Sequence, residues 1–307
     1  MEIKEANPRL NSATGGFAYS VTAITYFIAS LIISGIILLA KVEQWSTAHI
    51  YLLFLGSPIG IAAGVAATLG LRKVKFKEIC PVKCHPKYYL IGLMIAFGLF
   101  FSLNRINELI LGLFNLEASE QSIKISEFIL GLKGAQVLPA LLVIALLPAC
   151  FEELLFRGAI LQGAQNSMGS VRAILVVGFA FSLFHGSPEQ TVYQFIAGCL
   201  FAFVAVRSGS LLPSVLMHFL NNALVIILGM CLGVDEKGNF NMPFGVNIAL
   251  IVIGALCLVG GVVWLILDKT ELKKPQPDGV KSFFLFASVG IVLMAITWII
   301  SLVGVVT

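Results

Sequence analysis

Long runs of apolar residues, each about 20 residues in length, recur along the whole chain and are separated by short polar stretches. An α-helix rises 1.5 Å per residue, so about 20 apolar residues cross the roughly 30 Å hydrocarbon core of a bilayer. The pattern predicts an all-α, polytopic transmembrane helical bundle of about eight or nine spans. We place nine helices at residues 17–40, 48–71, 88–114, 136–165, 171–187, 189–207, 211–233, 244–267 and 282–305.

The fifth and sixth predicted helices are short, and only Pro188 separates them. Proline removes a backbone donor and interrupts a helix. One broken helix and two short helices therefore both fit the pattern, and the fold is all-α in either case.

Composition favours a membrane protein over a soluble one. Of the 307 residues, 58% are hydrophobic and only 12% are charged, whereas soluble domains have about 25% charged residues. The net charge of +4 gives no indication of a nucleic-acid partner. The six cysteines are scattered and predict no disulfide framework. We expect a multi-pass protein of the cell (plasma) membrane whose surface contacts membrane lipids.

Lysine and arginine are distributed unevenly among the predicted loops. The loop at 72–87 carries Arg72, Lys73, Lys75, Lys77, Lys83 and Lys87, and the loop at 268–281 carries Lys269, Lys273, Lys274 and Lys281. Such an excess of positive charge is typical of cytoplasmic loops. With nine spans, both loops fall on the side of the N-terminus, which we therefore predict to be cytoplasmic. Lys4, Arg9, Arg172 and Arg207 lie on this side as well, and Lys41, Lys124, Lys133 and Lys237 lie on the other.

The segment 104–133 is more polar than its neighbours and has the alternation of an interfacial amphipathic helix. It either gates access to a site or simply ends the third helix and covers the bundle. We treat the chain as one membrane domain in three parts. These are N-terminal helices with the amphipathic segment (1–135), a central core (136–230) and C-terminal helices (231–307).

Two adjacent glutamates and an arginine interrupt the apolar run 136–165. A charged side chain at the bilayer centre costs about 2.5 to 3.5 kcal/mol on insertion scales, so such residues mark functional sites. Glu153 and Arg157 are four residues apart and share a helical face, whereas Glu152 is turned about 100 degrees away. Glu153 is thus expected to pair with Arg157, and Glu152 is left to act as a general base. A purely structural ion pair between helices is the alternative interpretation.

Two histidines lie at a similar depth in later helices. Phe181 and His185 are one turn apart on one face, and His218 and Asn222 share another. An imidazole beside a carboxamide suits a developing oxyanion. Counted at 1.5 Å per residue from the predicted cytoplasmic helix ends near Gln165, Arg172 and Ser208, the residues Glu152, His185 and His218 lie roughly 20, 20 and 15 Å deep. All three can therefore meet.

These motifs resemble those of the CPBP family of intramembrane proteases, which includes the type II CAAX prenyl endopeptidases, or Abi and Rce-one-like group. The family pattern has two glutamates with an arginine four residues after the second, then Phe-x-x-x-His, then His-x-x-x-Asn or Asp. Here these are Glu152-Glu153 with Arg157, Phe181 with His185, and His218 with Asn222. The resemblance covers about residues 136–230.

The resemblance implies a conical catalytic cavity between the helices that carry the motifs. In it, Glu152 with His185 would activate water, His218 with Asn222 would hold the oxyanion, and Glu153 with Arg157 would fix the catalytic helix. We favour a glutamate-dependent hydrolase without a metal. The alternative is a zinc ion held by Glu152, His185 and His218. The chain has neither a His-Glu-x-x-His helix nor a Gly-x-Ser-x-Gly elbow.

The function expected from the resemblance is that of an intramembrane endopeptidase acting on a peptide or protein, with or without a lipid group. Its reaction is either CAAX-type C-terminal processing or processing of a small peptide such as a bacteriocin, with the substrate approaching from the cytoplasmic side. Two other classes are weighed against it. One is a non-catalytic immunity or scaffold protein on the same fold; the other is a transporter, since intramembrane acids and histidines also form proton relays.

Overall fold

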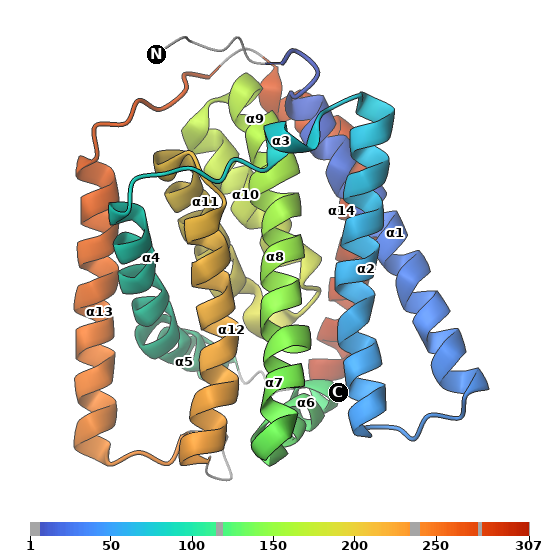
Figure 1. Cartoon of the computed structure of the whole chain (residues 1–307), viewed down its shortest axis with the longest axis vertical. Helices are drawn as coiled ribbons and strands as arrows, with labels where there is room; N and C mark the ends of the chain where they lie inside the picture. The colour runs from blue at the N-terminus through green and yellow to red at the C-terminus, as the bar shows by residue number, and fades with distance from the viewer. Residues whose placement is uncertain (1–6, 115–118, 234–239, 276–277, 307) are drawn as a thin grey trace.

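Residues 7–114, 119–233, 240–275 and 278–306 are described by the computed structural model, and they form helices without a β-strand. The all-α prediction is therefore confirmed (Figure 1). Two residues used in the predictions above, Lys4 and Lys237, lie outside the described residues. The α-helices are α1 Ser12–Leu39, α2 Thr47–Arg72, α3 Phe76–Ile79, α4 Lys87–Gly98, α5 Asn104–Phe114, α6 Glu120–Gly131, α7 Val137–Ala140, α8 Leu147–Glu153, α9 Leu161–Met168, α10 Ser170–Phe184, α11 Thr191–Ser208, α12 Leu212–Leu232, α13 Phe244–Leu267 and α14 Gly279–Val306.

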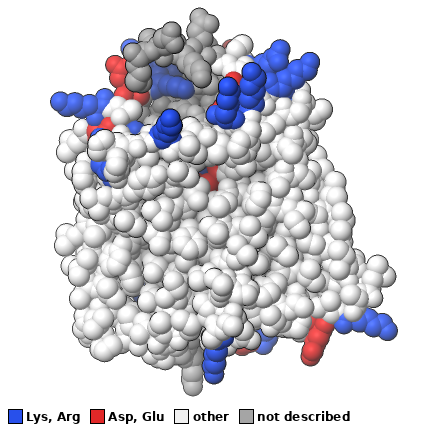
Figure 2. All heavy atoms as spheres, viewed as in Figure 1, with Lys and Arg blue, Asp and Glu red and all other residues white. Residues whose placement is uncertain are grey.

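Eight helices in the described part of the chain are long and apolar enough to cross a membrane. Two of them join several elements: Lys87–Phe114 combines α4 and α5, and Gly134–Met168 runs from the 3-10 turn that precedes α7 to the end of α9. The remaining predicted helix is α10, which has 15 residues and is shorter than the others. The chain is thus a multi-pass membrane protein, and Figure 2 shows a broad uncharged wall between two charged ends.

The region around Pro188 forms two helices and not one broken helix. Gly186 adopts a positive φ of 59°, which favours glycine, and Pro188 begins a short 3-10 turn before α11. The two helices form a hairpin because Gly178 and Gly198 let their backbones meet; a Cβ on Gly198 would lie 3.0 Å from the Cα of Gly178. In Figure 1 the turn of this hairpin lies inside the bundle.

Helices α1 and α2 pack along the glycines that repeat every four residues on α2. A Cβ on Gly60 or on Gly64 would lie 2.5 Å from a Cα atom of α1, so neither position has room for a side chain. Close helix approach through small residues is typical of membrane bundles, where packing drives association. On another side, α2 packs beside α8, the helix that carries the glutamates.

The predicted amphipathic segment 104–133 is two helices and not one. α5 continues α4 after a π-helical stretch at Leu99–Leu103. α6 begins at Ser119, whose hydroxyl caps the helix by accepting from the N–H of Ser122. The hydroxyl of Ser122 also donates to Glu189 at 2.5 Å, so α6 is attached to the turn of the α10–α11 hairpin.

One end of the bundle carries most of the positive charge, and we call it the basic end. It comprises the start of α1 and the loops 73–86 and 268–275. Side-chain hydrogen bonds hold these segments to their neighbours: Arg72 donates to Thr14 at 3.1 Å, and Lys273 donates to Asn166 at 2.5 Å. Figure 2 shows Lys and Arg side chains gathered at this end, with fewer at the opposite end. The charge asymmetry predicted from the sequence is therefore present across the fold.

Candidate active site

The helix that carries the glutamates is irregular on both sides of them. Pro148 has no N–H to donate to the carbonyl four residues earlier, which interrupts the helical hydrogen bonds. π-helical stretches flank α8 at Leu141–Leu146 (η3) and Leu154–Ile160 (η4). Such stretches are frequent at functional sites, because they shift side chains out of the regular helical register. Glu152 and Glu153 are the last two residues of α8 and lie between these two stretches.

Glu153 and Arg157 form the ion pair that their spacing predicts. The Nη1 atom of Arg157 lies 2.7 Å from the Oε1 atom of Glu153, and both side chains are fully buried. Arg157 also donates from Nη2 to the carbonyl oxygen of Gly198 at 2.9 Å. Its guanidinium lies over the rings of Phe181 and Phe201, at 4.5 and 5.1 Å from their centroids. The arginine thus connects the catalytic helix to the hairpin.

His185 lies directly after α10, at the hairpin turn. Its Nδ1 atom is 2.8 Å from the carbonyl oxygen of Phe181, one turn earlier. A carbonyl oxygen only accepts, so Nδ1 is the nitrogen that carries the proton in the neutral ring. The Nε2 atom then presents its lone pair to Glu152, whose Oε2 atom is 3.8 Å away.

His218 on α12 bridges the two glutamates. Its Nδ1 atom lies 2.9 Å from Oε1 of Glu153, and its Nε2 atom lies 4.0 Å from Oε2 of Glu152. The imidazole is buried against the ring of Phe201, with centroids 5.6 Å apart. Sequence reasoning missed the contact with Glu153, because no local spacing connects α8 to α12.

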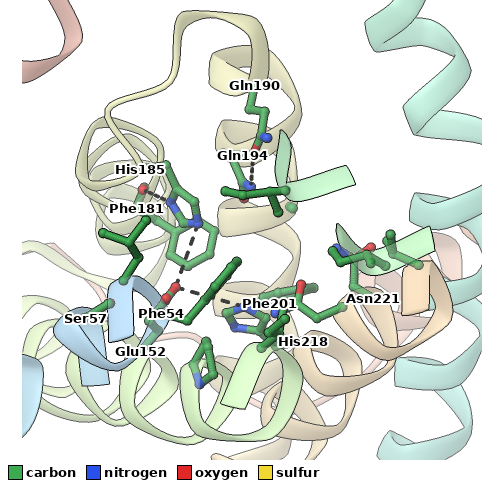
Figure 3. A pocket seen from close by; sticks show the side chains of 18 of the residues that line it. Phe54, Ser57, Glu152, Phe181, His185, Gln190, Gln194, Phe201, His218 and Asn221 are labelled. Carbon is green, nitrogen blue, oxygen red and sulfur yellow. Dashed lines mark hydrogen bonds and ion pairs between the residues drawn. The ribbon is translucent and has the colours of Figure 1, made fainter. Parts of the chain in front are cut away.

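Glu152 therefore stands between two imidazole nitrogens without a direct hydrogen bond to either. Its Oε2 atom is buried and has no hydrogen-bond partner among the described residues. Figure 3 shows His185 and His218 on two sides of this carboxylate. The structure thus brings together the three residues whose depth predicted a meeting point.

Asn222 lines the same cavity as these three residues, one turn after His218 on α12. The neighbouring Asn221 lines it as well, and the hydroxyl of Tyr193 donates to its side-chain oxygen at 2.5 Å. Each carboxamide offers N–H donors at the cavity wall. The site therefore has a base, two imidazoles and neutral donors around one space.

The cavity has a volume of about 410 Å³, within the range of small-molecule and peptide sites. Its lining comes from α1, α2, α6, the α7–α8 helix, α10, the hairpin turn with α11, and α12 (Figure 3). Lining residues that the sequence analysis did not single out are Tyr26, Ser57, Gln121, Gln190, Gln194 and Phe201. A signal for the last three existed, since Gln190, Gln194, Ala197 and Phe201 recur at helical spacing on one face.

The cavity extends away from the basic end. Along the α7–α8 helix its lining residues are Ile144, Pro148 and Glu152, and none follows Glu152 toward the basic end. The expectation of cytoplasmic basic loops and that of cytoplasmic substrate access therefore cannot both hold. The sequence could not reveal this conflict, because the direction of a cavity depends on how all of the helices pack.

The zinc alternative rests on Glu152, His185 and His218. Among the described residues, no group of three or more His, Cys, Asp or Glu side chains has the geometry of a metal site. The donors nonetheless fit zinc by type, since two imidazoles and a carboxylate are common zinc ligands. Both Nδ1 atoms are bound to oxygen acceptors, as those of metal-ligating histidines usually are.

Comparison with known families identifies this region. Residues 134–224 match the family model described as type II CAAX prenyl endopeptidase Rce1-like, and they contain all three motifs. This match confirms the resemblance to the CPBP family for residues 134–224, and that family consists generally of peptidases. No match was found among curated proteins or solved structures.

Proposed function

We propose that the protein is an intramembrane endopeptidase in which Glu152 and His185 activate a water molecule. One observation carries the proposal. The Oε2 atom of Glu152 is buried, has no hydrogen-bond partner among the described residues, and lies 3.8 Å from the Nε2 atom of His185 at the cavity wall. One water with hydrogen bonds of about 2.8 Å spans such a separation.

The tautomer of His185 decides how that water is held. Because Nδ1 donates to the carbonyl of Phe181, Nε2 accepts one hydrogen of the water while Glu152 accepts the other. The lone pairs of the water oxygen then point toward a bound carbonyl carbon. A water fixed in this way has lost its orientational freedom before the reaction, which lowers the barrier for attack.

Hydrolysis then proceeds by proton transfers through Glu152. The water oxygen bonds to the carbonyl carbon as Glu152 takes a proton, which gives a tetrahedral oxyanion. Glu152 returns the proton to the amide nitrogen as the C–N bond breaks, which leaves a new carboxyl group and a new amine. Asn222 donates to the oxyanion. His218 can donate from Nε2 only in its doubly protonated form, with Glu153 as counter-charge.

Cleavage of quenched peptides by purified wild type, Glu152→Ala and His185→Ala tests this proposal. Both variants must first be shown to unfold at a temperature close to that of the wild type. We expect each variant to lose cleavage by about 100-fold or more, and cleavage retained in both would refute the mechanism.

Metal analysis of the same preparations tests the zinc alternative. One zinc per active chain, lost together with activity on chelation, would assign Glu152, His185 and His218 as ligands and replace the metal-free mechanism. In cells, a phenotype that the two variants leave unchanged would favour the non-catalytic scaffold instead.

A further inference from the structure

On α8, α12 and α2 the lining of the cavity lies at the level of the catalytic residues and beyond them in one direction. On α12 the lining residues His218, Asn222 and Val225 proceed toward the end of the helix, away from the basic end. On α2 they are Leu53, Phe54 and Ser57, in the half of the helix farther from Arg72. Helix α6, at the end opposite the basic loops, contributes Gln121, Ile125 and Ile129.

The other direction is closed by packed side chains. Phe156, Arg157, Phe181 and Phe201 lie around the glutamates, and each is at most 2% exposed. The rings of Phe156 and Phe181 meet edge to face at 5.0 Å. A peptide therefore cannot reach Glu152 from the basic end without displacing this layer, whereas exposed residues such as Gln121 and Gln190 mark the rim at the far side.

The positive charge of the basic end sets a side of the membrane. Cytoplasmic loops carry the excess of Lys and Arg. At this end the described residues include Arg9, Arg72, Lys73, Lys75, Lys77, Lys83, Lys87, Arg172, Arg207, Lys269, Lys273, Lys274 and Lys281. Toward the opposite end they include Lys41, Arg105, Lys124 and Lys133. The basic end is therefore assigned to the cytoplasm, and the cavity faces the other half of the bilayer.

The wall of the cavity is uncharged apart from the catalytic groups. Its lining includes no Lys, Arg or Asp, and Glu152 is its one carboxylate among the described residues. A free C-terminal carboxylate would find no lysine or arginine there. The remaining surface combines apolar side chains with carboxamides, which match the N–H and C=O groups of a peptide backbone.

Two of the carboxamides form a ready contact for an extended peptide. Gln194 donates from Nε2 to Oε1 of Gln190 at 3.0 Å, one turn apart at the start of α11 (Figure 3). This pairing does not use the Nε2 donors of Gln190 or the Oε1 acceptor of Gln194, and both side chains line the cavity. One donor and one acceptor side by side can bind one peptide unit.

We infer that the substrate is an uncharged, apolar peptide segment that reaches Glu152 from the non-cytoplasmic half of the membrane, with its backbone bound by Gln190 and Gln194. The inference rests on the proposed endopeptidase function. It adds the side of access and the substrate class, both of which the residues of that mechanism leave open.

Sidedness is tested by labelling in intact cells. The variants are Lys77→Cys at the basic end and Lys133→Cys at the opposite end, each in the full chain with the six native cysteines replaced by alanine. Both positions are exposed. We expect a membrane-impermeant maleimide to label Lys133→Cys in intact cells and Lys77→Cys only after permeabilisation. The reverse labelling would overturn the inference and leave the endopeptidase function intact.

Access is tested with an impermeant quenched peptide of uncharged residues, added to right-side-out and inside-out vesicles and to detergent-solubilised protein. We expect cleavage in right-side-out vesicles and in detergent, and none with Glu152→Gln. Cleavage confined to inside-out vesicles and detergent would overturn the inference alone. No cleavage in any preparation, detergent included, would remove the proposed function and this inference with it.

The role of the carboxamides has its own readout. Gln190→Ala combined with Gln194→Ala is expected to raise KM for the uncharged peptide about threefold to tenfold while kcat changes little. Gln44→Ala, in an exposed loop at the same end of the bundle, is the matched control and should change neither constant. An unchanged KM in the double variant would exclude the two glutamines from substrate binding.

Discussion

The Nδ1 atom of His218 lies 2.9 Å from the Glu153 carboxylate, so the residue that neutralises Arg157 also orients an imidazole at the catalytic cavity. A carboxylate accepts hydrogen bonds and does not donate them, so Nδ1 carries the proton and Nε2 faces the cavity. We therefore expect Glu153 to position the imidazole of His218 as well as to pair with Arg157.

Replacing Glu153 with glutamine should separate positioning from general base chemistry. Arg157 and His218 both donate to the Oε1 atom of Glu153. The uncharged amide oxygen of Glu153→Gln accepts these two hydrogen bonds more weakly than a carboxylate does, so the imidazole is held less firmly. We expect kcat to fall about 10- to 100-fold, as with losses of comparable orienting groups, while KM stays close to the wild-type value. Steady-state kinetics on an uncharged peptide measure both constants, and an unchanged kcat would show that the contact does not matter for catalysis.

The buried ion pair predicts strongly coupled effects on stability. Arg157→Met leaves the carboxylate of Glu153 buried with only His218 as a partner, and breaking such a pair costs about 3 to 5 kcal/mol. The double variant Glu153→Gln with Arg157→Met removes both charges. Its loss of unfolding free energy should be smaller than the sum of the losses in the two single variants. Reversible denaturant unfolding in detergent measures each variant, with the exposed Arg172→Met as control. Additive losses would contradict the coupling.

The hairpin depends on the contact between Gly178 and α11. A Cβ at Gly178 would lie 2.3 Å from the sulfur of Cys199 and 3.1 Å from the carbonyl of Phe195, so Gly178→Val must push the two helices apart. This displaces His185, and we expect cleavage to fall at least about tenfold with a lower unfolding temperature. Gly35→Val, where nothing lies within 4 Å of an added Cβ, is the matched control and should retain activity.

At the basic end, Asp268 gives a prediction for the pH dependence of stability. Burial alone would raise the pKa of Asp268, but hydrogen bonds from Lys87, Thr270 and Tyr88 outweigh it and hold this pKa well below its usual range. The folded pKa is thus lower than the unfolded value of about 3.9. The stabilisation is present above that pH and is lost as the pH falls toward the folded pKa.

The variant Asp268→Asn should therefore unfold at a lower temperature than wild type at pH 7. The difference between the two should shrink as the pH is lowered below about 4. Thermal unfolding across this pH series measures it, and a difference that stays constant with pH would show that the carboxylate charge is not responsible.

The helices and the meeting of Glu152, His185 and His218 could be predicted because both depend on local quantities. Hydrophobic run length sets the spans, and residue counts along each helix set the depth of a side chain. The contact between His218 and Glu153 could not be predicted in this way, because it depends on the rotation of α12 relative to α8. The direction of the cavity was missed for the same reason, since it depends on the Phe156 and Phe201 layer and on where α6 docks.

Glu152 as the general base is the central claim, and one comparison tests it most directly. The measurement is the single-turnover rate of peptide cleavage by Glu152→Gln relative to wild type, with the unfolding temperature of both proteins recorded in the same detergent. Because the Oε2 atom of Glu152 has no hydrogen-bond partner among the described residues, we predict a nearly unchanged unfolding temperature and a rate lower by about 100-fold or more. A folded Glu152→Gln protein that cleaves within about threefold of the wild-type rate would contradict the account.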